Sequence, residues 1–208
     1  EKIIMLSHTN VAADELKDAI LKLPEMIERG LRKKFFKYKI CTIHAFCKSK
    51  LLKKELITYA DYLNLCAENS GFKAQRVTQS EFDNDKHKFF KFLSDSFGQG
   101  RTIREHWNSL RETSSNYYPY NNFRMIYEMK EVYDNYKKVN QVCDYNDMIK
   151  DFIDHAVVPD IDVLIVDEAQ DSNVPQIKAL EKMSTNVKEY YMVGDADQTI
   201  FEFAGANA

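Results

Sequence analysis

The sequence predicts an α/β fold in which a parallel sheet is interrupted by a helical insertion. Short apolar runs occur near both ends of the chain, at Lys2–Ser7, Lys39–Ile43, Val163–Val166 and Tyr190–Val193, and helical periodicity follows the first three. Between the two parts, the composition changes to long, charged, aromatic-rich segments with a helical period. With 208 residues, 44% of them hydrophobic, the chain can bury the core of one large domain or two small ones.

The first part of the chain predicts two strand–helix units. The run Lys2–Ser7 leads through Thr9 and Asn10 into a segment with apolar residues at helical spacing. The run Lys39–Ile43 passes directly into a second helical pattern that begins at His44. We therefore expect residues 1–52 to form the first part of the sheet domain.

The middle of the chain, residues 53–140, is predicted to be a separate helical insertion. Helical periodicity is clearest in Phe82–Phe97 and Phe123–Val139, and β-branched runs are few. Glycine and proline interrupt the periodicity at Ser96–Gly100 and Ser114–Pro119, so we expect loops there.

Residues 141–208 return to an α/β pattern. A helix is predicted to open within Cys143–Ile149, and Val174–Met183 is predicted to be a crossover helix. The continuous apolar runs Val163–Val166 and Tyr190–Val193 are typical of central strands of a parallel sheet, buried on both faces.

Charge distribution, apolar run length and cysteine spacing limit the classes of protein to which the chain can belong. The net charge is −3, but residues 1–139 carry 25 basic and 18 acidic groups, whereas residues 140–208 carry 4 and 14. One stretch could meet a phosphate backbone and the other a cation, or both could simply be solvated. No apolar run is long enough for a membrane span and no leader pattern is present, which indicates a soluble, cytoplasmic protein. The four cysteines lack paired spacing and are expected to be buried thiols.

The strongest chemical signal lies in Val163–Asp171, a predicted strand that ends in adjacent carboxylates. Open α/β sheets bind ligands at the carboxyl edge of their strands. There, Asp167 could hold the magnesium ion of a nucleotide, usually through water, and Glu168 could orient and deprotonate the attacking water. The alternative is an acidic turn that caps a helix.

A second signal follows the last apolar run. Gln198 is a neutral amide that could bond a γ-phosphate oxygen or the attacking water. Phe201 and Phe203 could offer faces on which bases stack, although either one alone is more often a core residue.

These segments together resemble superfamily 1 helicases of the UvrD, Rep and PcrA type. Ile3–Leu16 resembles the family's first DNA-contact motif, and Cys41–Cys47 resembles its second. Asp167–Asp171 is similar to the DExQD box, and Gly194–Phe201 to the GDxDQxIY motif. Four motifs in the family's order are a far more specific signal than one acidic pair.

The resemblance implies a RecA-like P-loop NTPase domain, called 1A, interrupted by a helical subdomain called 1B at residues 53–140. Its implied cofactors are ATP and Mg²⁺, and its implied partners are single-stranded DNA, single-strand/duplex junctions and further domains of the same polypeptide. Carried over by position, Glu168, Asp167 and Gln198 are catalytic, Asp167 holds the metal, and Gln198, Asp167 and Gln170 contact the nucleotide. The implied DNA-binding residues are His8, Thr9, Asn10, Thr42, His44, Phe201 and Phe203.

The sequence departs from the family pattern in ways that affect the prediction. The phosphate loop should precede Glu1 and is not among the 208 residues, nor is a second RecA-like domain. His8 stands where relatives often have phenylalanine, and Ala204 where many have arginine. We expect the intact protein to couple ATP hydrolysis to movement along DNA and to unwinding, and these residues alone to be inactive. The alternatives are a noncatalytic nucleic-acid-binding module with vestigial ATPase motifs and an RNA-directed relative.

Overall fold

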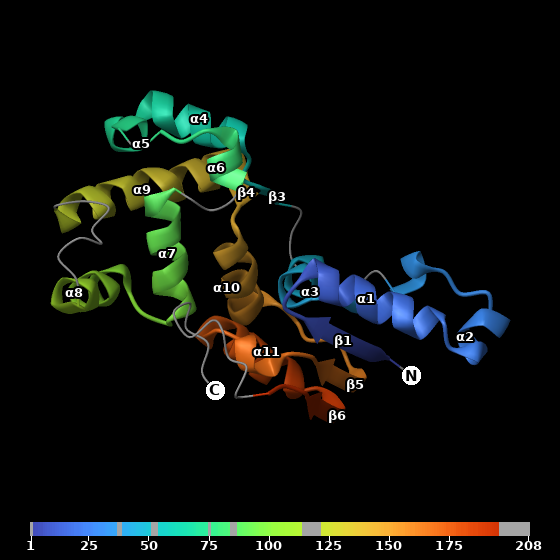
Figure 1. Ribbon diagram of the computed structural model, residues 1–208. Helices are drawn as coiled ribbons and strands as arrows, with labels where there is room; N and C mark the ends of the chain where they lie inside the picture. The colour runs from blue at the N-terminus through green and yellow to red at the C-terminus, as the bar shows by residue number, and fades with distance from the viewer. Residues whose placement is uncertain are drawn as a thin grey trace. The chain divides into compact units, whose positions relative to one another are not determined.

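The computed structural model describes residues 2–36, 39–50, 54–74, 76–83, 87–113 and 122–195. The chain divides into two compact units (Figure 1). Residues 1–52 and 148–208 make up one, here called the sheet unit, and residues 53–147 make up the other, here called the helical unit. The second boundary follows Asp147, whereas the sequence analysis placed it at residue 140.

The sheet unit contains four parallel strands in the order β2-β1-β5-β6. Their bounds are β1 (Ile3–Ser7), β2 (Ile40–Thr42), β5 (Ile161–Val166) and β6 (Val187–Met192). On β1, Met5 is in register with Ile40 on one side and with Ile165 on the other. The predicted α/β class with a parallel sheet is therefore confirmed.

The remaining elements of this unit connect the strands. They are α1 (Asn10–Leu21), α2 (Pro24–Glu28), the 3-10 helix η1 (Lys33–Phe36), α3 (Ile43–Ser49), α10 (Tyr145–His155) from Met148 onwards, the 3-10 helix η2 (Ala169–Asp171) and α11 (Val174–Ser184). Polar side chains cap three of the helix starts. Thr9 caps α1, Thr42 caps α3, and Asn173 caps α11 in a reciprocal capping box with Gln176.

The core of the sheet unit is apolar and centred on β1 and β5. Leu6, Leu164 and Val166 are fully buried, as is Phe152 of α10. Burial of these side chains is the main favourable term in the stability of such a unit.

The last strand differs from its prediction. We expected Tyr190–Val193 to be buried on both faces, but these four side chains are 37–55% exposed. The reason is position, because β6 is the end strand of the described sheet and its only described neighbour is β5. A run of apolar residues predicts that a segment forms a strand, but it does not predict whether another strand pairs with it on each side.

The helical unit contains short helices around an aromatic core. Its elements are β3 (Glu55–Leu56), α4 (Tyr59–Glu68), α5 (Ser70–Ala74), α6 (Gln79–Asp83), α7 (Lys88–Gly98), α8 (Ile103–Thr113), α9 (Phe123–Asn140) and β4 (Val142–Cys143). The core includes Tyr62, Phe72, Phe89, Trp107 and Tyr133. Strands β3 and β4 pair in parallel, so the segments that enter and leave most of this unit are joined to each other.

The prediction of a loop at Ser96–Gly100 is partly wrong. Ser96–Gly98 forms the last turn of α7, because the Ser96 hydroxyl is buried and donates to the Arg101 carbonyl at 2.9 Å. The chain turns only at Gln99 and Gly100, where Gly100 has a φ of 64°. The other predicted loop, Ser114–Pro119, lies outside the described residues.

The cysteine prediction is confirmed. Cys41, Cys47, Cys66 and Cys143 are all buried free thiols. Burial raises the pKa of Cys41 to about 11, so this thiol is protonated and unreactive at neutral pH.

Candidate functional site

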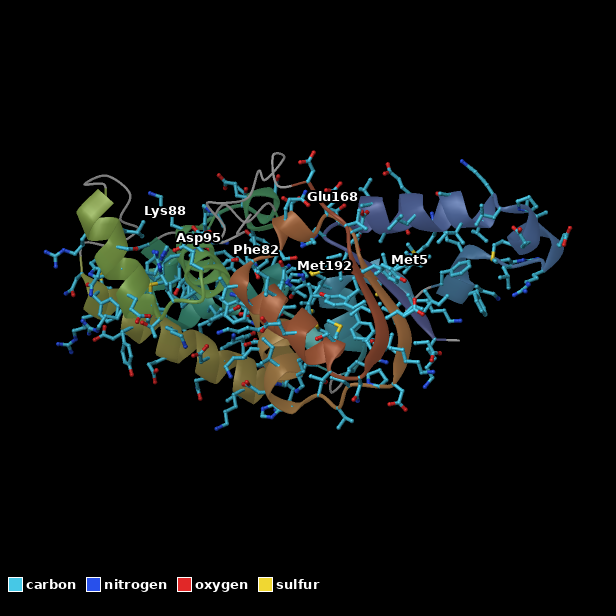
Figure 2. All side chains as sticks on the ribbon, turned by 90° about the horizontal axis from the view of Figure 1, so that it is seen from below. Met5, Phe82, Lys88, Asp95, Glu168 and Met192 are labelled. Atoms are coloured by element: carbon cyan, nitrogen blue, oxygen red, sulfur yellow. The ribbon has the colours of Figure 1, made fainter. Side chains whose placement is uncertain are left out.

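The loops that follow β1, β2 and β5 meet at one edge of the sheet. The register places Ser7 opposite Thr42 and Leu6 opposite Val166, so these three neighbouring strands end at the same level. Figure 2 shows Glu168 at this end of the strands, with Met5 and Met192 labelled on β1 and β6. The structure therefore brings together residues that lie far apart in the sequence, as expected at the carboxyl edge of a parallel sheet.

Asp167 and Glu168 lie directly beyond β5. The Asp167 N–H donates to the Leu6 carbonyl at 2.8 Å, which continues the pairing with β1 by one residue. Glu168 adopts a left-handed backbone conformation, with φ 53° and ψ 44°. For a residue with a side chain this conformation costs about 1–2 kcal/mol, so the surrounding bonds must hold it. Asp167 is half-buried and Glu168 is exposed.

Gln170 supplies two of the bonds that surround this turn. Its side-chain Nε2 donates to Glu168 Oε2 at 2.7 Å, and its Oε1 accepts from the Asp195 N–H at 3.2 Å. The Gln170 side chain thus bridges the loop after β5 and the segment after β6. We refer to this arrangement as the Gln170 bridge.

The bridge requires glycine at position 194. A Cβ at Gly194 would lie 2.2 Å from Gln170 Oε1 and 3.1 Å from the Ala169 nitrogen. Two main-chain hydrogen bonds hold the same two segments together. The Val193 N–H donates to the Val166 carbonyl, and the Ala169 N–H donates to the Val193 carbonyl. The GD pair of the last motif therefore serves a close contact within the protein.

In the loop after β1, one polar side chain is buried and the next ones along the chain are exposed at the start of α1. Ser7 is buried and its hydroxyl donates to the Thr9 carbonyl at 2.9 Å. Thr9 and Asn10 are exposed at the N-terminus of α1, and Thr9 Oγ1 accepts from the Ala12 N–H at 3.1 Å. Thr42 has the same capping role for α3, accepting from Ala45 at 3.1 Å, but it is buried.

Two histidines lie between these loops. His8 Nε2 is 3.0 Å from Ser172 Oγ, across 164 residues of sequence. Burial lowers the pKa of His8, although the charge of Asp171 opposes this effect. Burial and the neighbouring His8 lower the pKa of His44 to about 4. His44 is therefore neutral at pH 7 and would contact a phosphate as a hydrogen-bonding group and not as a cation.

Several predicted residues cannot be placed. Gln198, Phe201 and Phe203 lie outside the described residues. The roles of His8, Thr9, Asn10, Thr42, His44, Asp167, Glu168 and Gln170 remain predictions, although the structure gathers these residues at one edge. Sequence reasoning missed Ser7, Ser172 and Gly194 as supports of the site, because their partners are set by the fold.

The carboxylates fit the implied magnesium ion. The described part of the chain contains no group of three or more His, Cys, Asp or Glu side chains arranged as metal ligands. Magnesium bound with a nucleotide needs only one or two protein carboxylates, since phosphates and water complete its shell. Asp167, half-buried at a strand end beside exposed Glu168, has the chemistry and position that such a donor would need.

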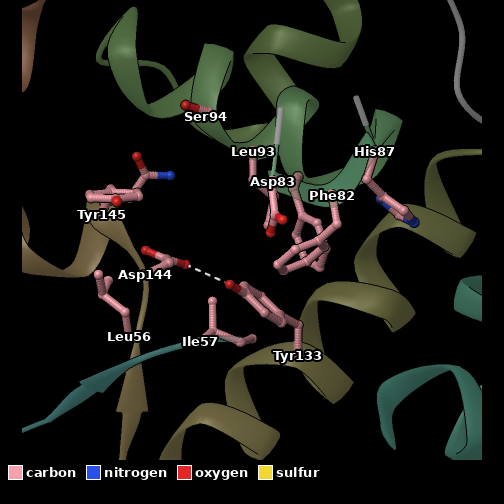
Figure 3. Close-up of a pocket in the computed structure, with 12 residues that line it drawn as sticks. Leu56, Ile57, Phe82, Asp83, His87, Leu93, Ser94, Tyr133, Asp144 and Tyr145 are labelled. Carbon is pink, nitrogen blue, oxygen red and sulfur yellow. Dashed lines mark hydrogen bonds between the residues drawn. The ribbon is translucent and has the colours of Figure 1, made fainter. Parts of the chain in front are cut away.

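A separate cavity of about 510 Å³ lies within the helical unit (Figure 3). Its walls include Leu56, Phe90, Asp83 and Asp144, and the Tyr133 hydroxyl donates to Asp144 at 2.9 Å. None of the predicted site residues lines this cavity. The cavity is therefore not the strand-end site that the motifs indicate.

The fold and the strand-end site define a RecA-like domain of the helicase class. The family model of the UvrD/REP helicase N-terminal domain matches residues 1–208, and the chain belongs to this family. No described helix is long and apolar enough to cross a membrane.

Curated relatives extend the comparison. The chain is 26% identical to the ATP-dependent DNA helicase Rep of Buchnera aphidicola subsp. Baizongia pistaciae, with 99% of this chain and 30% of that protein covered. It is 25% identical to a protein of Mycoplasma pneumoniae described as a probable DNA helicase II homolog, with 98% of this chain and 30% of that protein covered. A protein of the same description from Mycoplasma genitalium is 27% identical, with 99% and 30% covered. The chain thus spans about 30% of the length of these relatives.

Proposed function

We propose that this chain is part of an ATP-dependent DNA helicase or translocase, and that it carries the water-activating half of the ATPase site together with part of the DNA path. One observation carries the proposal. The acidic end of β5 and the loops that hold Thr9 and Thr42 lie at the same edge of the sheet. The names of the relatives, DNA helicases Rep and II, support the same function.

The proposed catalytic residues act through position and charge. Glu168 is exposed and its Oε2 is oriented by Gln170, so it can hold and deprotonate the attacking water. Asp167 would hold Mg²⁺ through water, and the ion would neutralise charge on the transferred phosphate. Gln198 would bond the γ-phosphate. The 208 residues do not include the lysine and the main-chain N–H groups with which a phosphate loop holds ATP. We therefore propose that these 208 residues alone do not hydrolyse ATP.

The proposed DNA contacts lie on the neighbouring loops. Thr9 and Asn10 are exposed at the start of the twelve-residue helix α1, where main-chain N–H groups and the helix dipole favour a phosphate. Thr42 and His44 would contact the backbone from the β2 loop, and Phe201 and Phe203 would stack on bases. Alternating closure with a second domain would then move the strand.

The test is a substitution in the complete protein. Glu168→Gln keeps the shape of the side chain and removes its basicity, so we expect the ATPase kcat to fall by about 100-fold or more while nucleotide affinity is retained. The matched control is Glu181→Gln, an exposed glutamate on α11, which should leave kcat unchanged. Turnover retained in Glu168→Gln would remove Glu168 as the base.

The same assay separates the alternatives. ATPase activity of the complete protein should rise with added single-stranded DNA and not with single-stranded RNA. Equal stimulation by RNA would favour the RNA-directed relative. DNA binding without any ATPase activity would favour the noncatalytic module.

A further inference from the structure

The loop after β1 connects an exposed surface to a buried contact. Thr9 and Asn10 are exposed, whereas the preceding residue, His8, is half-buried and reaches Ser172. Ser172 is fully buried, at 0% exposure. While the His8 ring is in place, the Ser172 hydroxyl has no access to solvent.

Ser172 belongs to the segment that holds the proposed base. It follows η2, and its N–H donates to the Ala169 carbonyl at 3.1 Å. The preceding 3-10 turn contains Gln170, whose amide bonds Glu168 at 2.7 Å. Ser172 also precedes Asn173, which caps α11. His8 therefore contacts a turn that adjoins helix α11 on one side and carries the Gln170 bridge on the other.

Two buried polar atoms beside this contact are unpaired within the part of the chain that the structure describes. His8 Nδ1 and Asp171 Oδ1 are both buried and have no hydrogen-bond partner among the described residues. These two groups are close enough for the charge of Asp171 to act on the His8 ring. Ser172 contacts Nε2 and the unpaired Nδ1 belongs to the same ring, so a movement of the ring changes the surroundings of both atoms.

We propose that His8 is a positioning residue that couples occupancy of the Thr9–Asn10 loop to the placement of Glu168, through Ser172 and the Gln170 bridge. This inference rests on the proposed function. Nucleic acid bound at the loop shifts His8, the η2 turn follows, and the Glu168 carboxylate moves into its productive position. Coupling between two sites of a protein is typically 5- to 150-fold.

The experiment measures ATPase activity of the complete protein with and without a saturating single-stranded DNA oligonucleotide. Ser172→Ala removes the hydroxyl without changing a residue that is proposed to contact nucleotide or DNA. We expect basal ATPase within two-fold of wild type and a stimulation ratio at least five-fold lower. Ser184→Ala is the matched control, because that hydroxyl donates to the Glu181 carbonyl on α11 and should leave the ratio unchanged.

Substitutions of His8 distinguish the hydrogen bond from packing. His8→Phe keeps a flat ring but no ring nitrogen, so the stimulation ratio should fall as in Ser172→Ala, with no further fall in the double variant. His8→Gln keeps an amide at the reach of Nε2 and should restore most of the stimulation. The dissociation constant for the oligonucleotide, measured by fluorescence anisotropy, should change by less than two-fold in Ser172→Ala.

The outcomes separate this inference from the proposed function. Wild-type stimulation that persists in Ser172→Ala and His8→Phe would overturn the coupling alone. An equal fall of basal and stimulated rates would also overturn it, because that result describes a structural role. A wild-type protein without DNA-stimulated ATPase would overturn the proposed function, and the coupling with it.

Discussion

At the scale of single residues, the strand-end site depends on how closely Gly194 approaches the Gln170 side chain. The amide of Gln170 holds both Glu168 and the Asp195 main chain, and it occupies the space that a Cβ at position 194 would need. Glu168 itself is held in a left-handed conformation. The position of the proposed base, Glu168, is thus set by Gln170 and Gly194, neither of which is a proposed catalytic residue.

We expect Gly194→Ala to lower the ATPase kcat of the complete protein by about 10- to 100-fold, because the new methyl group displaces Gln170 and releases Glu168. The overpacking should also cost about 1–3 kcal/mol of stability. Activity and thermal unfolding would be measured together. The control is Gly30→Ala, where nothing lies within 4 Å and the φ of +62° costs stability only. A normal kcat in Gly194→Ala would show that the Gln170 bridge does not position Glu168.

At the scale of elements, α7 begins at a buried polar residue inside an aromatic cluster. His87 is 1% exposed and precedes the first residue of α7. Its ring lies 4.7 Å from that of Phe90 and 5.2 Å from that of Tyr62, between centroids. Neither ring nitrogen has a hydrogen-bond partner among the described residues, and burial lowers the pKa to about 4. The ring is therefore neutral in the folded helical unit.

This pKa makes the stability of the helical unit depend on pH. The unfolded chain binds a proton at His87 near pH 6.5, while the folded unit does so only near pH 4. Stability from this residue is therefore complete above about pH 6.5 and is lost as the pH falls towards 4, by about 3 kcal/mol in all. In His87→Phe this loss should disappear. Urea unfolding at pH 7 and pH 5 measures the part of this loss, about 2 kcal/mol, that falls between these two pH values.

The control for this prediction is His155→Phe, which replaces an exposed histidine on α10. The wild type and this control should lose the same stability between pH 7 and pH 5. If His87→Phe loses as much as they do, the ring of His87 is already protonated or hydrogen-bonded in the folded unit.

At the scale of the whole molecule, the sequence predicted the elements better than their neighbours. Continuous apolar runs located β1, β2, β5 and β6, because strands of parallel sheets are rich in apolar residues. The same reasoning overstated the burial of β6, whose partners are not encoded in its own residues. Strands β3 and β4 have two residues each, too few for any periodicity.

In the candidate site, too, the sequence predicts some features, and only the fold determines the others. Adjacent carboxylates after an apolar strand can be recognised in the sequence, and the structure places Asp167 and Glu168 at the expected edge. The contact of His8 with Ser172 joins residues 164 positions apart, and only the fold brings them together. The Gln170 bridge likewise depends on the approach of Gly194, which no local pattern encodes.

The exposed edge of β6 leads to a prediction for the 208 residues produced alone. Tyr191 and Met192 are more than half exposed, and edge strands of this kind promote association between chains. Tyr191→Lys should lower the associated fraction in analytical ultracentrifugation. Tyr127→Lys on α9, also an exposed tyrosine, is the control and should change little. Equal association in both variants would mean that chains associate through another surface.

The pairing of β1 with β5 has a consequence for synthesis on the ribosome. Ile3 lies opposite Val163, so β1 cannot pair with β5 until the residues between these two strands have been synthesised. Residues 53–147 are continuous, and their contacts can form while translation proceeds. The nascent chain would thus complete its helical unit first, and the pairing of β1 with β5 would follow.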